Sequence, residues 1–355
     1  MLSSGQTIVA CLAAASAYVG SLYVFVPAAV RCLPRDDPKH IRYRMAAAMF
    51  MSTALLALLS FCYSSLAPDS ALQHVRIGRA LGIPADVYTW FAAASSTVLL
   101  MAVFYAGPLL SFALYVSVCA ANEVSHRGTC SALEASCPRK SVAAVCKEFL
   151  VAQAMHARAA PEMQLRALVV APLSEETVFR AITIVIMALG CSPSPGSDVG
   201  ATAAAGMDPW STALYCPLWF AVAHAHHAAT RWGEVLQAAG PGGSQSKQRL
   251  FLLQVVVPTL VQLTYTTIFG YIATLLFLRT GTLVAPVLSH VICNYAQLPN
   301  VSFLTAPGSA SAQEYSSLHS YRWLLLAVHA AGLVGFALLV LPTTESMSSS
   351  SPYWP

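Results

Sequence analysis

The chain has 355 residues, of which 57% are hydrophobic and only 10% are charged. With a mean hydropathy of +0.62, this composition excludes an ordinary soluble domain. The net charge of +4 is small and no block of Lys or Arg occurs, so we expect no nucleic-acid partner. In lipid, helices and closed barrels are the structures that satisfy their own backbone, and these apolar runs are too long for barrel strands. We therefore predict an all-α, polytopic membrane protein.

Polar loops divide the chain into about eight predicted transmembrane helices. Residues 343–355 form a Ser-rich tail that we predict to be disordered, so residues 1–342 are expected to form a single membrane domain. Residues 142–160 predict an amphipathic helix on the membrane surface. The predicted spans are residues 2–30, 45–67, 87–121, 165–190, 210–229, 250–278, 282–299 and 323–341.

The third apolar run, residues 87–121, is long for a single helix. It could be one tilted helix kinked at Pro108 or a broken pair of helices, and the sequence leaves both open. With one crossing, fifteen of the nineteen Lys and Arg residues fall in one set of alternating loops, which predicts that these loops are cytosolic. Arg76, Arg79 and Arg279 then lie on the other side, with the N-terminus. Two crossings would invert the assignment downstream.

The fourth predicted span carries charged side chains, although charge inside a membrane is costly and usually marks function. Its segment from Ala171 to Ala181 reads Ala-Pro-Leu-Ser-Glu-Glu-Thr-Val-Phe-Arg-Ala. Glu176 and Arg180 are one helical turn apart on the same face, so we predict an ion pair between them. Glu175 lies roughly 100° around the helix, away from Arg180, and is the less committed of the two acids to an ion pair. An available acid beside a neutralised neighbour is suited to act as a general base.

Two further polar groups are predicted within the membrane. Phe220 and His224 lie four residues apart near the end of the fifth span, and His290 and Asn294 lie one turn apart on one face of the seventh. On the predicted topology these groups and Glu175 all lie toward the cytosolic ends of their helices. We therefore expect one active site inside the helical bundle, near its cytosolic side.

Three motifs follow one another on three predicted helices: Glu-Glu-x-x-x-Arg from Glu175, Phe-x-x-x-His from Phe220 and His-x-x-x-Asn from His290. This ordered set resembles the motifs of the type II CAAX prenyl endopeptidases, which are glutamate-type intramembrane proteases. Other segments are similar to the eukaryotic members and extend the resemblance over most of the chain. They are Tyr18-Val-Gly-Ser-Leu-Tyr-Val, Leu33-Pro-Arg-Asp, Tyr265-Thr-Thr-Ile-Phe-Gly and Phe277-Leu-Arg-Thr-Gly-Thr-Leu-Val-Ala-Pro-Val-Leu-Ser-His-Val-Ile-Cys-Asn-Tyr.

The resemblance implies a multi-pass enzyme of the endoplasmic-reticulum membrane with an active site accessible from the cytosol. Its substrates would be farnesylated or geranylgeranylated CAAX proteins, such as Ras- and Rho-type small GTPases. Its reaction would remove the last three residues, aaX. The isoprenoid would anchor the substrate in membrane lipid and bring the C-terminal peptide to the cytosolic face.

Peptide hydrolysis needs an activated water and hydrogen-bond donors for the oxyanion. We assign Glu175 as the general base, with His224 sharing the proton transfers. His290 and Asn294 are expected to stabilise the transition state by hydrogen bonds to the oxyanion. Glu176 stays open as an alternative base. The residues expected to orient and support this set are Glu176, Arg180, Phe220 and His227.

We expect no cofactor, although zinc is an alternative, because His224, His290 and a Glu are suitable ligand types. The absence of a His-Glu-x-x-His motif and the weakness of Asn as a zinc ligand disfavour it. His226 points to a different face from His224, whereas His227 could share its site. The ten cysteines are scattered without a disulfide or zinc framework, so we predict reduced thiols.

The sequence leaves two other functions to consider. A thiol nucleophile at Cys293 is disfavoured, because this residue points about 100° away from the face that His290 and Asn294 share. A transporter or membrane scaffold, in which buried Glu, His and Arg carry protons or hold helices together, is the non-enzymatic alternative. Against it stand the lack of an internal repeat and the presence of the whole motif set.

Overall fold

The computed structural model describes residues 2–70, 72–84, 86–125, 141–191, 207–239, 251–307 and 314–354. The secondary structure of these ranges is helical and includes no strand, which confirms the predicted all-α class. Shorter apolar helices at Ala106–Val118 and Val284–Ala296 accompany longer ones, as in a polytopic membrane protein. The described helices that are long and apolar enough to cross a membrane are Ser4–Val24, Pro38–Leu66, Val87–Phe104, Leu253–Thr280 and Tyr315–Thr343.

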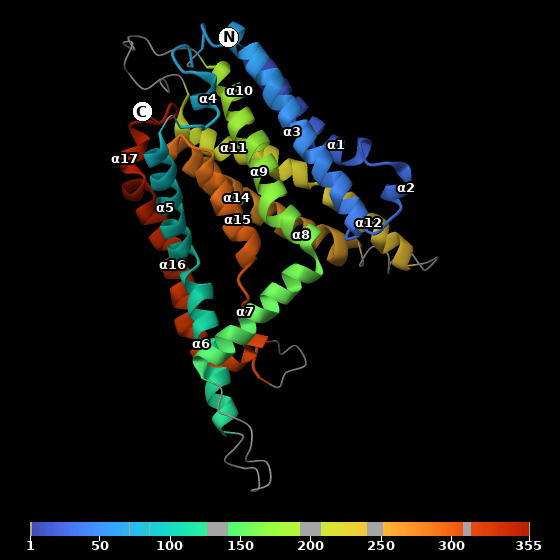
Figure 1. Ribbon diagram of the computed structural model, residues 1–355, viewed down its shortest axis with the longest axis vertical. Coiled ribbons are helices and arrows are strands. Elements are labelled where there is room, and N and C mark those ends of the chain that lie inside the picture. Colours follow the sequence, from blue (N-terminus) through green and yellow to red (C-terminus); the bar gives the residue numbers. More distant parts are fainter. Residues whose placement is uncertain are drawn as a thin grey trace. The chain divides into compact units, whose positions relative to one another are not determined.

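The chain forms two compact units, whose helices are labelled in Figure 1. The first comprises Met1–Thr97, Arg166–Val291 and Thr344–Pro355, and the second Val98–Leu165 and Ile292–Thr343. The first unit holds α1 (Ser4–Val24), α2 (Ala28–Arg31), α3 (Pro38–Leu66), α4 (Ile77–Ala80), η1 (Arg166–Val170), α9 (Ala171–Glu176), η2 (Thr177–Ile182), α10 (Thr183–Leu189), α11 (Pro209–His224), α12 (His226–Ala239), η3 (Leu252–Val256), α14 (Val257–Thr280) and α17 (Glu345–Ser348). The second holds α6 (Ala106–Ser125), α7 (Val142–Ala159), α8 (Pro161–Leu165), η4 (Ser302–Leu304), η5 (Glu314–Tyr321) and α16 (Arg322–Thr343).

Two helices, α5 (Val87–Phe104) and α15 (Val284–Ala296), run from one unit into the other. The helix expected over residues 142–160 is present as α7. That residues 1–342 form a single membrane protease domain stays a prediction.

Sequence signals set where several helices begin and end. Ser3 forms a capping box at the start of α1. Asp37 and Asp208, each followed by a proline, cap α3 and α11. Hydrogen bonds from Ser211 hold the pKa of the Asp208 carboxyl below its usual value, which favours the charged cap. Gly281 ends α14 with a φ of 61°, a left-handed conformation that glycine adopts without a steric cost.

The third apolar run is one helix interrupted at Tyr105, the junction of α5 and α6. The Tyr105 amide donates to the Met101 carbonyl at 2.9 Å, and the Leu109 amide donates to the Tyr105 carbonyl at 2.9 Å. The helical hydrogen-bond pattern therefore continues across the junction. Pro108 has no N–H to bond the Phe104 carbonyl, which accounts for the interruption.

Contacts within the first unit distinguish the two topologies that the sequence left open. Arg79 donates to the Ser350 carbonyl, and Arg279 Nη2 lies 3.0 Å from Glu345 Oε2. Arg79 and Arg279 therefore contact the same C-terminal segment. A single crossing by residues 87–121 places these two arginines on one side of a membrane, whereas two crossings place them on opposite sides. The structure favours the single, kinked crossing.

The C-terminal tail, expected to be disordered, instead folds against the first unit. The Arg279 side chain, at the end of α14, is buried and donates to Thr344 Oγ1 at 2.9 Å. Its guanidinium lies 4.7 Å from the centre of the Trp354 ring. Tyr353 is fully buried and donates its hydroxyl to the Ala80 carbonyl. The Ser content of the tail concealed these two aromatic anchors and the buried cation that needs them.

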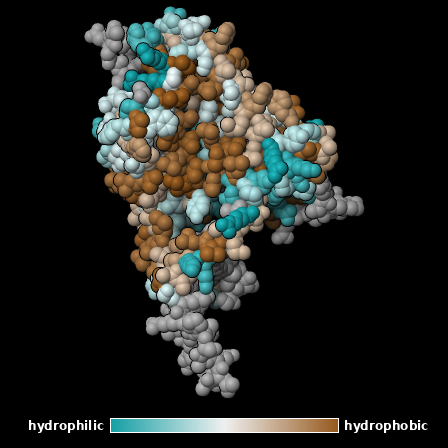
Figure 2. Space-filling view, in the orientation of Figure 1, coloured by the Kyte–Doolittle hydropathy of each residue, from teal (hydrophilic) through white to brown (hydrophobic). Residues whose placement is uncertain are grey.

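Large hydrophobic side chains cover much of the exposed surface, and Figure 2 shows them gathered into a broad area on one face. Exposed fractions reach 82% for Phe61 and 71% for Leu338. In water such a surface would be unfavourable, whereas in lipid it carries no such cost. This agrees with the predicted membrane location.

We predict that deleting Thr344–Pro355 destabilises the protein. Tyr353 and Trp354 would lose their buried sites, worth about 3 kcal/mol or more in total, and Arg279 would lose its partners. Thermal unfolding of the purified protein in detergent should show a lower midpoint for the deletion, and Tyr353→Phe, which keeps the ring, should show a smaller change. An unchanged midpoint for the deletion would contradict the role given to the tail.

Candidate active site

The predicted fourth span is continuous helix from Pro161 to Leu189, and two π-helical segments, η1 and η2, flank the short α9. At the end of η2, Thr183, the first residue of α10, donates its Oγ1 hydrogen to the Val178 carbonyl five residues earlier at 2.8 Å. π-Helical turns are rare and occur frequently at functional sites. Here they adjoin the two glutamates, Glu175 and Glu176, which end α9.

Glu176 and Arg180 form the ion pair that their spacing predicted. Both side chains are completely buried, with Arg180 Nη1 3.1 Å from Glu176 Oε1 and Arg180 Nε 3.1 Å from Glu176 Oε2. The guanidinium also lies 4.5 Å from the centre of the Phe220 ring and 5.5 Å from that of Phe269. Aromatic faces attract a cation, so the buried charge is compensated on several sides.

His290 lies between the two glutamates. Its Nδ1 is 2.7 Å from Glu176 Oε1, and its Nε2 is 3.9 Å from Glu175 Oε2. An ionised carboxylate can only accept hydrogen bonds, so Nδ1 carries the hydrogen and donates a hydrogen bond to Glu176. The Phe269 ring, 4.9 Å from the imidazole between centres, packs against His290 and holds its plane.

Glu175 differs from its neighbour in exposure. Its side chain is 20% exposed, against 0% for Glu176. The Glu175 carboxylate lies 3.9 Å from His290, farther than the Glu176 carboxylate does. At this separation one water molecule can hydrogen-bond both Glu175 and His290. The sequence analysis expected Glu175 to be the less committed acid, and its surroundings agree.

Phe220 connects His224 to this cluster. The Phe220 ring lies 4.5 Å from the His224 ring and 6.3 Å from the His290 ring, between centres. His224 Nδ1 is 2.8 Å from the Phe220 carbonyl, which can only accept, so Nδ1 is protonated and Nε2 is left to accept a proton. His224 is half-buried.

His227 lies beside His224, with the ring centres 5.8 Å apart. Its Nδ1 accepts a hydrogen bond from Arg35 Nη1 at 3.3 Å. His227 is thus near the site, as predicted, but it is engaged by a residue that the sequence analysis did not assign to it.

Asn294 follows His290 by one turn on α15, in the part of the helix that belongs to the second unit. Its role as an oxyanion donor stays a prediction, as do the catalytic roles of the other residues. Among the described residues, no group of three His, Cys, Asp or Glu side chains is arranged to hold a metal ion. The expectation that no cofactor is required likewise stays a prediction.

Sequence reasoning missed three contacts of this site. The Glu176–His290 hydrogen bond joins residues 114 positions apart, and no short-range spacing signals it. The Tyr18 hydroxyl forms a hydrogen bond of 2.9 Å with the Ser174 hydroxyl, next to Glu175. This bond holds α9 against α1. The Tyr18 segment had been noticed for its resemblance alone. Phe269 offered no signal beyond being an aromatic residue in a span.

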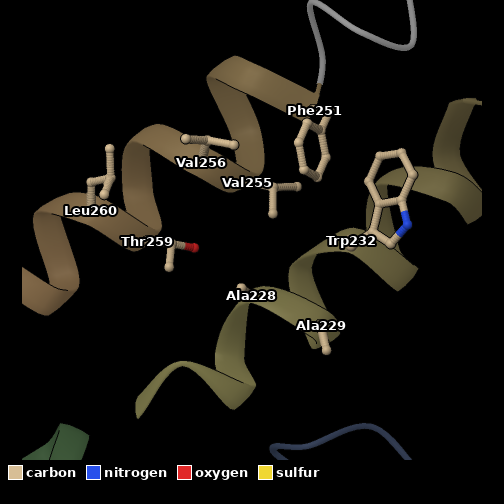
Figure 3. A pocket seen from close by; sticks show the side chains of 8 residues that line it. All are labelled: Ala228, Ala229, Trp232, Phe251, Val255, Val256, Thr259 and Leu260. Atoms are coloured by element: carbon tan, nitrogen blue, oxygen red, sulfur yellow. The ribbon is translucent and has the colours of Figure 1, made fainter. Parts of the chain in front are cut away.

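A cavity of about 330 Å³ lies between α12 and the helical segment made by η3 and the start of α14 (Figure 3). Its walls are apolar apart from Thr259, whose hydroxyl accepts a hydrogen bond from Arg231 at 3.0 Å. α12 begins two residues after His224, so the cavity lies directly downstream of the candidate site along the chain. The lining residues are Ala228, Ala229, Trp232, Phe251, Val255, Val256, Thr259 and Leu260.

Comparison with known proteins identifies the motif set. Residues 157–296 match the family model of the type II CAAX prenyl endopeptidases of the Rce1-like kind, and this segment contains every predicted site residue. The chain is 29% identical over 344 residues to CAAX prenyl protease 2 of Homo sapiens, covering 96% of this chain and 81% of the relative. The chain is thus similar to CAAX prenyl protease 2 over most of its length, and its residues 157–296 match the type II CAAX prenyl endopeptidase family model.

Other relatives agree with this placement. CAAX prenyl protease 2 of Rattus norvegicus is 28% identical over 96% of this chain and 80% of its own length. CAAX prenyl protease 2 of Arabidopsis thaliana is 30% identical over 53% of this chain and 48% of its own length. No solved structure matches the chain. The three motifs that begin at Glu175, Phe220 and His290 lie on three separate helical segments, α9–η2, α11 and α15, as predicted from the sequence.

We predict that the two adjacent glutamates contribute unequally to stability. Glu176→Gln removes the charge that neutralises the buried Arg180, and breaking such a pair costs about 3–5 kcal/mol. Glu175→Gln changes a partly exposed carboxylate whose nearest basic group, His290 Nε2, lies 3.9 Å away, so it should lower stability much less than Glu176→Gln. Thermal unfolding in detergent compares the two variants, which differ by one position and carry the same substitution. Equal midpoints would contradict this division of roles.

Proposed function

We propose that this chain is an intramembrane endopeptidase that removes the C-terminal aaX tripeptide from prenylated CAAX proteins. The observation that carries the proposal is His290 held between Glu176 and Glu175, within a segment that matches the prenyl endopeptidase family. The names of the relatives support the substrate class. A transporter or scaffold has no such support.

We extend the proposal to farnesylated and geranylgeranylated substrates of the Ras and Rho type, and to the endoplasmic-reticulum membrane with access from the cytosol. The exposed apolar surface suits contact with membrane lipid, where a prenylated substrate is concentrated.

In the proposed mechanism Glu175 removes a proton from a water that then attacks the carbonyl carbon of the prenylated cysteine. The choice of Glu175 over Glu176 rests on exposure and on partners. Glu176 is fully buried, and its oxygens already face Arg180 and His290. A base that is neutralised in this way is a weak acceptor for a further proton.

His224 and His290 handle the remaining charges. His224 Nε2 accepts the proton that Glu175 took from water and delivers it to the amine nitrogen of the leaving tripeptide as the C–N bond breaks, which returns Glu175 and His224 to their starting states. His290 donates a hydrogen bond from its ring to the oxyanion, and the contact of Nδ1 with Glu176 fixes the orientation of that ring. Asn294 adds a neutral amide donor to the oxyanion.

Cleavage of a farnesylated CAAX peptide by the purified protein in liposomes tests the mechanism. Wild-type activity should persist with a zinc chelator, whereas Glu175→Ala should abolish it. Asn294→Ala should lower kcat by about 10²- to 10³-fold. Glu234→Ala, which removes an exposed acid of α12, is the control and should retain activity.

Two outcomes would overturn parts of this proposal. Loss of wild-type activity with chelator, restored by zinc, would replace water activation by Glu175 with the zinc-dependent alternative. No cleavage by a folded wild type, with several aaX sequences and with both isoprenoids, would overturn the assignment as a protease.

We place the isoprenoid of the substrate in the apolar cavity between α12 and α14. Its lining offers almost no polar atoms, which suits a hydrocarbon chain. Ala228→Phe should fill part of the cavity and raise KM for a farnesylated peptide severalfold, with a smaller change in kcat. Val261→Phe adds the same ring on the exposed side of α14 and serves as the control. Equal KM values for Ala228→Phe and wild type would place the isoprenoid elsewhere.

A further inference from the structure

Three arginines from separate elements gather beside the candidate active site, and we call them the arginine cluster: Arg35, Arg44 and Arg166. Arg35 lies in the loop between α2 and α3, Arg44 on α3 and Arg166 at the start of η1. η1 packs against α3, and Arg35 lies three residues before the start of α3, so the three side chains come from neighbouring elements, where the charges of Arg35 and Arg166 both act on Arg44. All three side chains are half-buried. In the described part of the chain none of them forms an ion pair with Asp or Glu.

Such a cluster is electrostatically unfavourable in the free protein. Arginine stays protonated, so the three positive charges repel one another and cannot be relieved by losing a proton. The hydrogen-bond partner of Arg35 is the neutral ring nitrogen of His227, at 3.3 Å, which satisfies a donor without neutralising the charge. An anion bound among the guanidiniums would remove the repulsion and accept several charge-assisted hydrogen bonds.

The cluster adjoins the catalytic residues. Arg35 contacts His227, whose ring neighbours that of His224. α3, which carries Arg44, packs against α9, which carries Glu175, and the Tyr18 hydroxyl bonds Ser174 on the same short helix. The anion that meets the cluster is therefore one that is present during the reaction, beside the base and the proton donor.

We propose that the arginine cluster binds the free C-terminal carboxylate of the substrate peptide and thereby sets the position of the cut. This inference rests on the proposed function. A carboxylate three residues beyond the scissile bond lies roughly 10 Å from it in an extended peptide. Its binding site must therefore be adjacent to the catalytic residues and separate from them, as the cluster is.

The test compares two farnesylated peptides of one sequence, one ending in a free acid and the other in an amide. Wild-type protein in phosphatidylcholine vesicles should cleave the acid at least about tenfold more efficiently in kcat/KM, the range of one charge-assisted hydrogen bond. Arg35→Gln and Arg44→Gln should each lower kcat/KM for the acid and leave the amide almost unaffected. The result is the ratio of kcat/KM for the acid to kcat/KM for the amide, measured within each variant. A variant that folds poorly loses activity on both peptides equally, so this ratio does not change.

Matched controls separate charge from position. Arg31→Gln removes one positive charge from an exposed site at the end of α2, close in sequence to Arg35, and should keep the wild-type ratio. Arg35→Lys keeps the charge without the two-pronged geometry and should restore part of the preference.

Each remaining outcome overturns a different statement. A wild type that cleaves neither peptide overturns the proposed function itself. A wild type that cleaves both equally, or variants that keep the acid preference, overturns this inference and leaves the proposed function intact. Variants that lose activity on both peptides, and only in vesicles with phosphatidylserine, would assign the cluster to lipid headgroups instead.

Discussion

A buried guanidinium cannot escape its charge by losing a proton, so the packing around Arg180 has to neutralise it. The Glu176 carboxylate does so within one helical turn, and the rings of Phe220 and Phe269 cover the remaining faces. The same carboxylate holds His290 from the far end of the chain. The buried Glu176–Arg180 pair thus joins η2, α11, α14 and α15 and fixes the orientation of His290. The geometry of the site depends on this ion pair.

The pair also explains how two identical side chains at adjacent positions take different roles. Helical geometry turns Glu175 away from the face on which Glu176 meets Arg180. Glu176 has its charge compensated and is excluded from solvent, whereas Glu175 remains partly exposed, 3.9 Å from the imidazole. Proton transfer needs an acid that can change its charge, and structural support needs one that does not. Burial therefore suits Glu175 to the proposed proton transfer and Glu176 to structural support.

The sequence was sufficient for interactions within one helix and insufficient for those between helices. The Glu176–Arg180 pair followed from a spacing of four residues, and the helices followed from hydropathy. The Glu176–His290 bond and the packing of Phe269 depend on how distant helices cross, which no local pattern encodes. The tail was misjudged because composition counts its serines, while its structure depends on Tyr353, Trp354 and the buried Arg279.

A lipidated C-terminal peptide presents three kinds of chemistry: a hydrocarbon chain, a peptide bond and a carboxylate. The first unit holds the apolar cavity, the glutamate–histidine pair and the arginine cluster, to which these three chemistries are assigned in the proposal. The apolar cavity begins four residues after His224, while His227 contacts Arg35 of the arginine cluster. A peptide held at both its isoprenoid and its carboxylate has one register relative to Glu175. Selection of a single bond would then follow from the two anchored ends, without recognition of every side chain between them.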